Sequence, residues 1–439
     1  MRTLIRAAVG SSFDRVRWWL GVGAGVATEQ ALGAAANFVF TILLARWLDI
    51  AGYGEYAVGY ALLWLVWGFY EGLLLDPAML FSSSKFRDQL RTYHSTLLIG
   101  HALLSIVFVV AFATAGTVAK AAGLDKAAPP WFMLAVAGPV IFLPQLLRGL
   151  CRARLQTSVG ASGAALYAVC LLAGIAIDHY LQLLSATTAF AVMALASAAC
   201  ALWLIWRLDL SLRRLPLGRG GLCAQIAVEH WSYGRWLASA NLLSWMPMNI
   251  WYAALPLLAG IEAAAVMRAL SNLAQPLVQA YAAAHSILIP AFVQAQEKQR
   301  FRRDLNVVLV TAFGSALAFA AAVGLLRSPL IAWLYHGRYL TETILIWPIM
   351  VRAAFMGVSV VQSAAMQSLE RGDWLVASFA VSTGTIVLVG LPATAIWGLE
   401  GAVWSQLLAE LTVAMSQRWW LRSSSPALGQ LVKRRQATP

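Results

Sequence analysis

The chain has 439 residues, of which 60% are hydrophobic and 12% are charged, and its formal net charge is +13. Soluble domains carry about twice that charged share, which excludes an ordinary soluble enzyme. In a soluble protein the positive excess would suggest a nucleic-acid partner, but in a membrane protein the basic loops on the cytoplasmic side explain it more simply. We therefore expect no nucleic-acid partner.

Long uncharged apolar runs recur along the whole chain, and a bilayer span needs roughly 20 such residues. The runs Thr92 to Ala119, Leu155 to Ile177 and Trp374 to Leu399 contain no Asp, Glu, Lys or Arg. Transmembrane strands would alternate apolar and polar residues, and these runs do not. The pattern predicts an all-α polytopic membrane protein with about twelve spans, at roughly 22–48, 53–80, 93–119, 130–151, 157–179, 184–206, 236–258, 263–292, 305–326, 342–368, 374–396 and 401–420.

Basic residues alternate between the loops that these spans define. Under this assignment 25 Lys and Arg residues fall on one side of the membrane and 5 on the other. Cytoplasmic loops are the ones enriched in Lys and Arg, so the bias predicts that both termini lie in the cytoplasm.

The longest loop divides the spans into two groups of six. Residues 207–235 are basic and contain Pro216 and several glycines, which is typical of a linker. We predict an N-terminal six-helix bundle at 1–206, the cytoplasmic linker at 207–235, a C-terminal six-helix bundle at 236–422 and a basic cytoplasmic tail at 423–439. Two related halves are a common transporter plan.

The sequence also indicates what the protein does not use. It has no G-x-x-x-x-G-K-[ST] motif, so direct ATP hydrolysis is not expected. The longest outside loops, 120–129 and 327–341, are too short to hold a catalytic domain, so we do not expect an enzyme. The four cysteines lack paired spacing, and we expect no disulfide, metal or cofactor.

Ionisable residues within spans are costly and are therefore candidate functional residues. Arg268 lies in the eighth span, and Arg268, Asn272, Gln275 and Gln279 recur at spacings of four, three and four. On one helix this spacing would place a guanidinium and three amides on a single face. Such a face is either a binding stripe for an anionic, hydroxyl-rich group or a hydrogen-bonded seam between helices.

Further polar residues lie in other spans. Arg352 follows Pro348 in the tenth span and is either a second binding residue or one partner of a structural ion pair. The remaining candidates for substrate binding are Asn37 in the first span and Asn241 and Asn249, which flank Pro247 in the seventh. The candidates for ion coupling or charge pairing are Glu29, Glu71, Asp76 and Glu410.

Two regions resemble the Wzx-type polysaccharide flippases. The segment Asn37–Asp49 with Gly52–Val58 is similar to the family's junction between helices 1 and 2. The segments Tyr233–Leu237 and Val266–Leu273 are similar to its region around helices 7 and 8. The resemblance implies the MOP superfamily fold, shared with MATE exporters, in which two six-helix bundles surround a central cavity.

The resemblance further implies a function. Members of this family are thought to move polyprenyl-pyrophosphate-linked oligosaccharides across the bacterial inner membrane by alternating access, for surface or exopolysaccharide biosynthesis. Arg268 would then attract the pyrophosphate, and Asn272, Gln275 and Asn241 would bind sugar hydroxyls. The implied partners are the lipid-linked oligosaccharide, membrane lipids and glycosyltransferases or a polysaccharide polymerase.

Two other functions fit the same pattern of spans. A MATE-like drug or cation exporter would need carboxylates and aromatic residues in its cavity. A non-transporting scaffold of a polysaccharide synthase would need no moving helices, and the sequence alone does not distinguish it.

Overall fold

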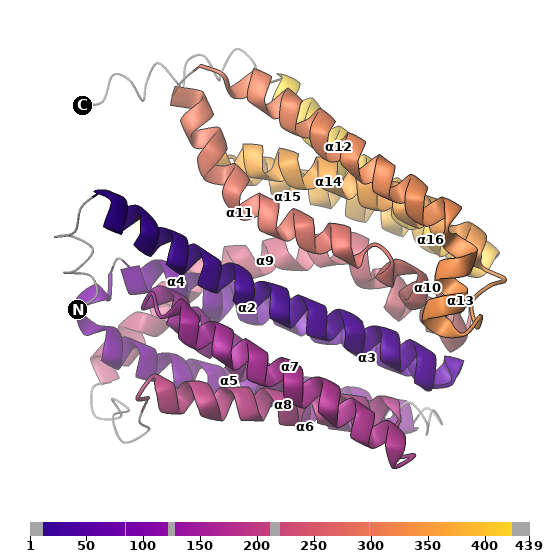
Figure 1. The fold of residues 1–439 in the computed structure, drawn as a ribbon, viewed down its shortest axis with the longest axis horizontal. Coiled ribbons are helices and arrows are strands. Elements are labelled where there is room, and N and C mark those ends of the chain that lie inside the picture. The colour runs from indigo at the N-terminus through magenta and orange to yellow at the C-terminus, as the bar shows by residue number, and fades with distance from the viewer. Residues whose placement is uncertain (1–11, 84, 122–127, 211–219, 298, 424–439) are drawn as a thin grey trace. The chain divides into compact units, whose positions relative to one another are not determined.

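A computed structural model of the chain describes residues 12–83, 85–121, 128–210, 220–297 and 299–423. The described residues are almost entirely helical, without a strand among them (Figure 1). The predicted all-α membrane fold is thus confirmed. The predicted basic tail from residue 424 onward and the middle of the predicted linker, 211–219, lie outside the described residues.

The helices overlap the predicted spans. They are α2 (Ser12–Trp47), α3 (Ile50–Tyr70), α4 (Asp76–Ser83), α5 (Leu90–Ala121), α6 (Ala128–Ala153), α7 (Thr157–Tyr180), α8 (Ala186–Arg207), α9 (Gly220–Leu258), α10 (Ile261–Asn272), α11 (Gln275–Glu297), α12 (Phe301–Leu325), α14 (Ile346–Ser368), α15 (Gly372–Thr385) and α16 (Leu391–Ser423). Two π-helical turns, η1 (Glu71–Leu75) and η5 (Ile386–Gly390), join α3 to α4 and α15 to α16. The short helix α13 (Arg327–Tyr335) occupies the segment that was expected to be an outside loop.

Nine helical stretches of the described chain are long and apolar enough to cross a bilayer. A tenth appears if Gln275–His285 and Ile287–Gln296, which meet at 43°, form one bent span. Helix α9 has the length to cross, at 39 residues, although it is less apolar. The stretch Gly372–Ser423 turns back on itself at Gly398 and, at 52 residues, is long enough to cross twice. The described residues thus hold nine such stretches, or ten with the bent pair, where the sequence predicted twelve spans, and the predicted span 263–292 is divided into α10 and α11.

The reversal at Gly398 is visible in its backbone and in the contacts around it. Gly398 has φ 57° and ψ −129°, a conformation that favours glycine. The helical segments before and after Gly398 lie side by side, since Ser382 Oγ in the first donates to Ala409 O in the second at 2.9 Å. A Cβ on Gly401 would collide with the carbonyl oxygen of Ala393, so the two segments approach as closely as a glycine allows.

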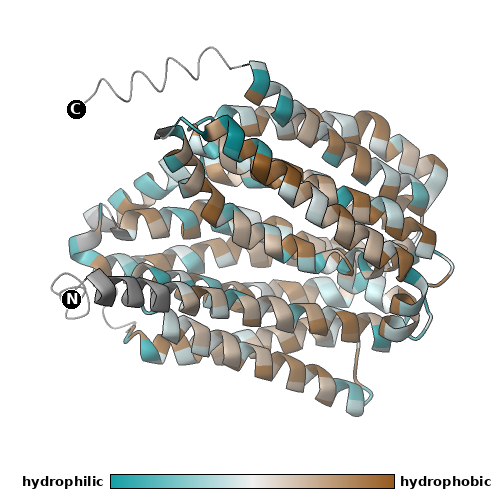
Figure 2. Ribbon diagram, turned by 45° about the horizontal axis from the view of Figure 1, so that its top comes forward, coloured by the Kyte–Doolittle hydropathy of each residue, from teal (hydrophilic) through white to brown (hydrophobic). Residues whose placement is uncertain are grey.

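Large apolar side chains are exposed along the helices, as expected of surfaces that face lipid. Leu257, Trp333 and Val310 are 84%, 74% and 73% exposed. Hydrophobic residues dominate the helix bodies, whereas hydrophilic residues gather largely toward helix ends (Figure 2). Bilayers favour this distribution because hydrocarbon offers no partner for a polar group.

The chain divides into two compact units. Unit 1 comprises Met1–Leu48 and Leu62–Asn241, and unit 2 comprises Asp49–Ala61 and Leu242–Pro439. The boundaries differ from the predicted halves because α3 and α9 each contribute one part to each unit. The predicted linker is also shorter than expected, since α9 already begins at Gly220.

In unit 1, α2 packs against α7, α6 packs against α5 and α8, and α7 packs against α8. The core is rich in small residues that bring the backbones close together. A Cβ on Gly163 would lie 2.9 Å from Leu204 Cδ2, and one on Gly174 would lie 2.8 Å from Val192 Cγ1. Such small-residue contacts are the usual way in which membrane helices pack tightly.

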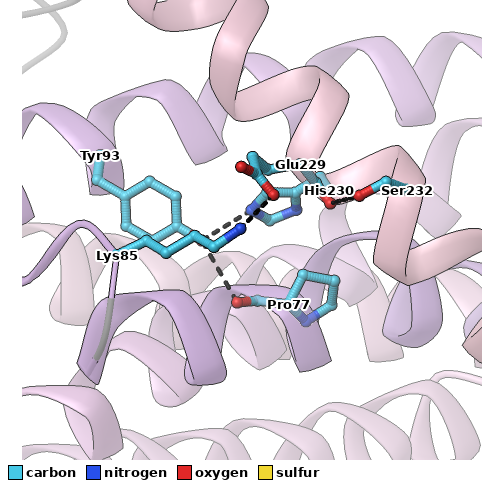
Figure 3. A network of polar contacts seen from close by, with 6 residues as sticks. All are labelled: Pro77, Lys85, Tyr93, Glu229, His230 and Ser232. Carbon is cyan, nitrogen blue, oxygen red and sulfur yellow. Dashed lines mark hydrogen bonds and ion pairs between the residues drawn. The ribbon is translucent and has the colours of Figure 1, made fainter.

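The first half of α9 is held to unit 1 by a polar network (Figure 3). His230 accepts a hydrogen bond from the Tyr93 hydroxyl at Nε2, 2.7 Å, while its Nδ1 lies 3.1 Å from the carbonyl oxygen of Leu73 in the π-helical turn η1. A carbonyl can only accept, so Nδ1 carries the proton in this arrangement. Lys85 and Glu229 form an ion pair beside this network.

In unit 2, α14 lies at the centre and packs against α11, α12 and α16. Trp251 and Tyr252 of α9 are buried in one core cluster together with Met267 of α10. Phe292 and Trp374 belong to a second cluster nearer the ends of α11 and α15. The second half of α9 therefore packs as part of unit 2.

Candidate functional site

Arg268 lies on α10 in unit 2 and is only 9% exposed. Its Cζ lies 4.6 Å from the centroid of the Tyr60 ring and 5.8 Å from that of Tyr252. Cation–π contacts of this kind are strongest where water is excluded. The Nε of Arg268 is buried and has no hydrogen-bond partner. The guanidinium is thus held by aromatic faces and keeps an unused donor.

The tyrosines around Arg268 come mainly from one face of α3. Tyr53, Tyr56 and Tyr60 are spaced by three and four residues, which places them in a row along the helix. Their ring centroids lie 6.1 Å apart for the first pair and 5.5 Å apart for the second. The sequence analysis did not single out these three tyrosines, although their spacing of three and four residues along a predicted span indicates a shared helical face.

Asn272 ends α10 and is almost fully buried, at 1% exposure. Its Nδ2 donates to the Tyr53 hydroxyl at 3.0 Å, which ties the end of α10 to the tyrosine row. Tyr335 of α13 donates to the carbonyl oxygen of Ala269 at 2.9 Å. The predicted outside loop therefore supplies a side chain that fixes the helix carrying Arg268.

The four polar residues predicted to share one helical face do not form a continuous stripe. The helix is broken at Leu273 and Ala274, where amide hydrogen bonds switch to carbonyls three residues back. Pro276 explains the break, because it has no N–H to continue the α-helical ladder from α10. Arg268 and Asn272 are buried, Gln275 is half-buried and Gln279 is exposed.

Arg352 on α14 and Glu410 on α16 form a second buried pair of charges in unit 2, at 5% and 6% exposure. Glu410 Oε1 accepts a hydrogen bond from Ser359 Oγ at 2.7 Å. Among the described residues no carboxylate lies within 4.0 Å of Arg352, and its Nε and Nη1 have no hydrogen-bond partner.

Tyr252 connects the two arginines. Its ring lies beside Arg268, and its hydroxyl and the Glu410 carboxylate both interact electrostatically with Arg352. Two buried guanidiniums with unused N–H groups therefore approach the same tyrosine. Charge-assisted hydrogen bonds to an anionic group are the chemistry that such donors favour.

The asparagines of α9 lie apart from each other. Asn241 donates from Nδ2 to the carbonyl oxygen of Gly68 at 3.0 Å and belongs to unit 1. Asn249 contacts the carbonyl of Trp245 on its own helix at 3.5 Å and belongs to unit 2.

Asn37 in unit 1 lies at the seam between α2 and α7. It accepts a hydrogen bond from the Tyr167 hydroxyl at 3.0 Å and donates to the carbonyl of Gly33 at 2.9 Å. The contacts that the structure gives Asn37 are thus those of a packing residue.

Glu29 in unit 1 is 2% exposed and is paired with two arginines of α6. Arg152 Nη1 lies 3.1 Å from Glu29 Oε1, and Arg148 Nε lies 4.0 Å from the same atom. Both arginines lie near the end of α6, which extends to Ala153. Glu29 is thus a charge partner within unit 1.

Glu71 and Asp76 flank the π-helical turn η1. The wider turn brings these residues, five apart, onto one side, where their charges repel each other. The Trp67 side chain donates a hydrogen bond to the Glu71 carboxylate. Both residues are half-buried, so η1 places two carboxyl groups close together on one side of the helix.

Comparison with known proteins gives a fold but not a sequence family. No protein-family model matches the chain, and no curated protein matches it. An inward-facing structure of a multidrug resistance MATE family transporter of the MOP superfamily matches with a TM-score of 0.75 at 15% identity, covering 91% of this chain and 96% of that chain.

The fold is that of the MATE transporters. An outward-facing structure of a multidrug resistance MATE family transporter matches with a TM-score of 0.63 at 14% identity, covering 93% of this chain and 95% of that chain. A variant of the Vibrio cholerae MATE transporter VcmN matches with a TM-score of 0.66 at 12% identity, covering 93% of this chain and 98% of that chain. The MATE fold that the resemblance implied is therefore confirmed.

Proposed function

We propose that the chain is a bacterial inner-membrane transporter that flips a polyprenyl-pyrophosphate-linked oligosaccharide from the cytoplasmic to the outer leaflet. Solved transporters of this fold include inward-facing and outward-facing structures, which supports an alternating-access mechanism. The basic loops support a cytoplasmic location for both termini. The exported oligosaccharide would serve surface or exopolysaccharide biosynthesis.

The surroundings of Arg268 are the main support for an anionic, pyrophosphate-linked substrate. A buried guanidinium costs several kcal/mol to desolvate unless hydrogen bonds or an opposite charge compensate. Arg268 is buried among tyrosine rings, with an Nε that has no hydrogen-bond partner. A pyrophosphate head group would provide the missing acceptor, and tyrosine hydroxyls and amides nearby suit a hydroxyl-rich sugar.

The second arginine strengthens the proposal. Arg352 has two unused N–H groups and lies near Tyr252, which also contacts Arg268. A pyrophosphate carries two phosphoryl groups, and two buried guanidiniums with unused N–H groups in unit 2 provide donors for both.

A MATE-like drug or cation exporter is the second candidate, because two of the matching structures are described as multidrug resistance transporters. Such a protein needs a buried carboxylate for its cationic substrate. The buried carboxylates of the described residues are Glu29 and Glu410, and each lies near an arginine. This charge balance favours an anionic substrate.

A leaflet assay tests the proposal in a deletion strain complemented with wild type, Arg268→Ala or Arg303→Ala. Arg303 is an exposed cation on α12 and serves as the matched control. We expect the lipid-linked oligosaccharide to accumulate on the cytoplasmic face in the deletion strain and in Arg268→Ala only. Normal translocation by Arg268→Ala would refute the site. Drug sensitivity of the deletion strain with normal surface glycan would instead favour an exporter.

A further inference from the structure

A groove of about 790 Å³ opens on the surface of unit 2 between α12 and α16, with α14 at its base. Val310 on α12 and Met415 on α16 line it and are 73% and 69% exposed, so the groove faces outward. In a membrane this surface meets lipid. The groove is separate from the arginines described above, which are buried.

One end of the groove is polar on α14 and α16. Arg418 and Arg422 of α16 lie there together with Gln362 of α14. The hydrogen bond from Gln417 Nε2 to Ser363 Oγ, 3.0 Å, shows that α14 and α16 are level at this point. Arg418 Nη2 also contacts Asn306 Oδ1 at 3.4 Å, which places the first turns of α12 at the same level.

The rest of the groove is apolar on the same three helices. Moving away from the arginines, α12 contributes Val310 and Phe313, α14 contributes Val358 and Phe355, and α16 contributes Met415. The groove thus combines a cationic end with a long apolar channel. Trp419, 60% exposed, lies beside the arginines, where an aromatic ring typically marks the membrane interface.

Gln362 gives an independent sign that the groove takes a ligand. Gln362 is only 2% exposed, yet its Oε1 has no hydrogen-bond partner. A buried acceptor without a donor is costly, and native structures contain few of them. The residue lies at the level of the arginines, where the head group of a bound lipid would present hydroxyl groups.

We propose that this groove binds an anionic phospholipid such as phosphatidylglycerol. The phosphate would pair with Arg418 and Arg422, a glycerol hydroxyl would donate to Gln362 Oε1, and an acyl chain would lie along Phe313 and Phe355. No carboxylate lines the groove among the described residues, so the charge is complementary to an anionic head group.

The test is the binding of phosphatidylglycerol to the purified full chain, compared with phosphatidylcholine, by native mass spectrometry and thermal unfolding. The variants are Arg418→Ala/Arg422→Ala, which removes the cationic end, and Val358→Trp, which fills the channel. Each basic residue near a membrane surface contributes about 1 kcal/mol to anionic lipid binding. We therefore expect affinity for phosphatidylglycerol to fall roughly 30-fold in the double variant.

Matched controls separate the groove from general charge and surface effects. Arg300→Ala/Arg303→Ala removes two exposed charges near the start of α12, and Val381→Trp adds an indole on the exposed face of α15. Both controls should retain the preference for phosphatidylglycerol. Equal binding of phosphatidylcholine, or unchanged binding by Val358→Trp, would overturn the proposal. Co-purification of a polyprenyl phosphate at this groove would also overturn it. The comparison of phosphatidylglycerol with phosphatidylcholine does not depend on which substrate is transported.

Discussion

Arg268 stacks over the ring of Tyr60, with its Cζ 4.6 Å from the ring centroid. The ring of Tyr60 attracts the positive charge of this buried arginine electrostatically. The ring face does not accept the conventional hydrogen bonds of the guanidinium N–H groups. A carboxylate in the same position would have neutralised the arginine and occupied those donors. The tyrosine keeps the guanidinium in place while leaving it able to bind an anion.

Replacing Tyr60 tests this relationship. We expect Tyr60→Leu to lower the free energy of unfolding by about 2 kcal/mol, the contribution of a desolvated cation–π contact. Tyr60→Phe keeps the ring and should remain close to wild type. Thermal unfolding in detergent measures the stability, and the leaflet assay measures transport. Equal losses for Leu and Phe would show that the hydroxyl, not the ring face, holds Arg268.

Glu410 and Arg352 provide a second test, because Glu410 is bonded to Ser359 and not directly to the arginine. If Arg352 binds the substrate's phosphate, the nearby Glu410 competes with that anion. We expect Glu410→Gln to tighten the binding of a fluorescent isoprenyl pyrophosphate about tenfold, or 1.4 kcal/mol. Arg352→Ala should abolish the binding.

The control for this prediction is Ser359→Ala, which removes the hydrogen bond to Glu410 but no charge. It should leave the affinity for the isoprenyl pyrophosphate within a few-fold of wild type. Weaker binding by Glu410→Gln would mean that the carboxylate positions Arg352 and does not compete with the substrate.

The sequence predicted the helical architecture well, because long apolar runs have one stable solution in a bilayer. It also identified Arg268 and Arg352 as buried, since charged side chains within spans almost always face the bundle interior or a water-filled cavity. It did not predict what surrounds them. Tyr252 reaches Arg268 from α9, and no local pattern predicts a contact between helices.

Two features that the sequence did not predict have particular causes. The face of Arg268, Asn272, Gln275 and Gln279 was predicted on an unbroken helix, but Pro276 interrupts the hydrogen-bond ladder. Glu29 was predicted as a candidate for charge pairing without its partners, because a count of basic residues on each side of the membrane does not show that Arg148 and Arg152 turn toward it.

The pairing of Glu29 with these arginines predicts a stability change. Removing one partner of a buried ion pair costs about 3–5 kcal/mol, because the other charge stays buried without compensation. We expect Glu29→Gln to lower the unfolding free energy by that amount. Glu29→Gln/Arg152→Gln should recover part of the loss, which a double-mutant cycle measures. Additive losses would show that the two side chains are not coupled.

The network around His230 predicts a contrast between buried and exposed contacts. Tyr93→Phe removes the hydroxyl that bonds His230 and should cost about 1 kcal/mol of unfolding free energy. Glu229→Gln breaks an ion pair that is partly exposed, and such pairs contribute about 0–1 kcal/mol. Thermal unfolding at low and high salt distinguishes the two contacts. Only the Lys85–Glu229 ion pair should be sensitive to salt, because it is partly exposed. A larger loss for Glu229→Gln would contradict this assignment.

Gly54 offers the sharpest test of how α3 packs in unit 2. A Cβ at this position would collide with the backbone carbonyl oxygen of Ile261, which cannot move without displacing the start of α10. We expect Gly54→Ala to lower the unfolding free energy by about 1–3 kcal/mol, the usual cost of overpacking. It should also reduce transport, because Tyr53, Tyr56 and Tyr60 share the helix and would shift away from Arg268. Gly314→Ala is the matched control, since a Cβ there meets no atom within 4 Å and alanine favours the helix. If both variants had the stability of wild type, α3 and α10 would not be in close contact, and the tyrosine row would lose the support that holds Arg268.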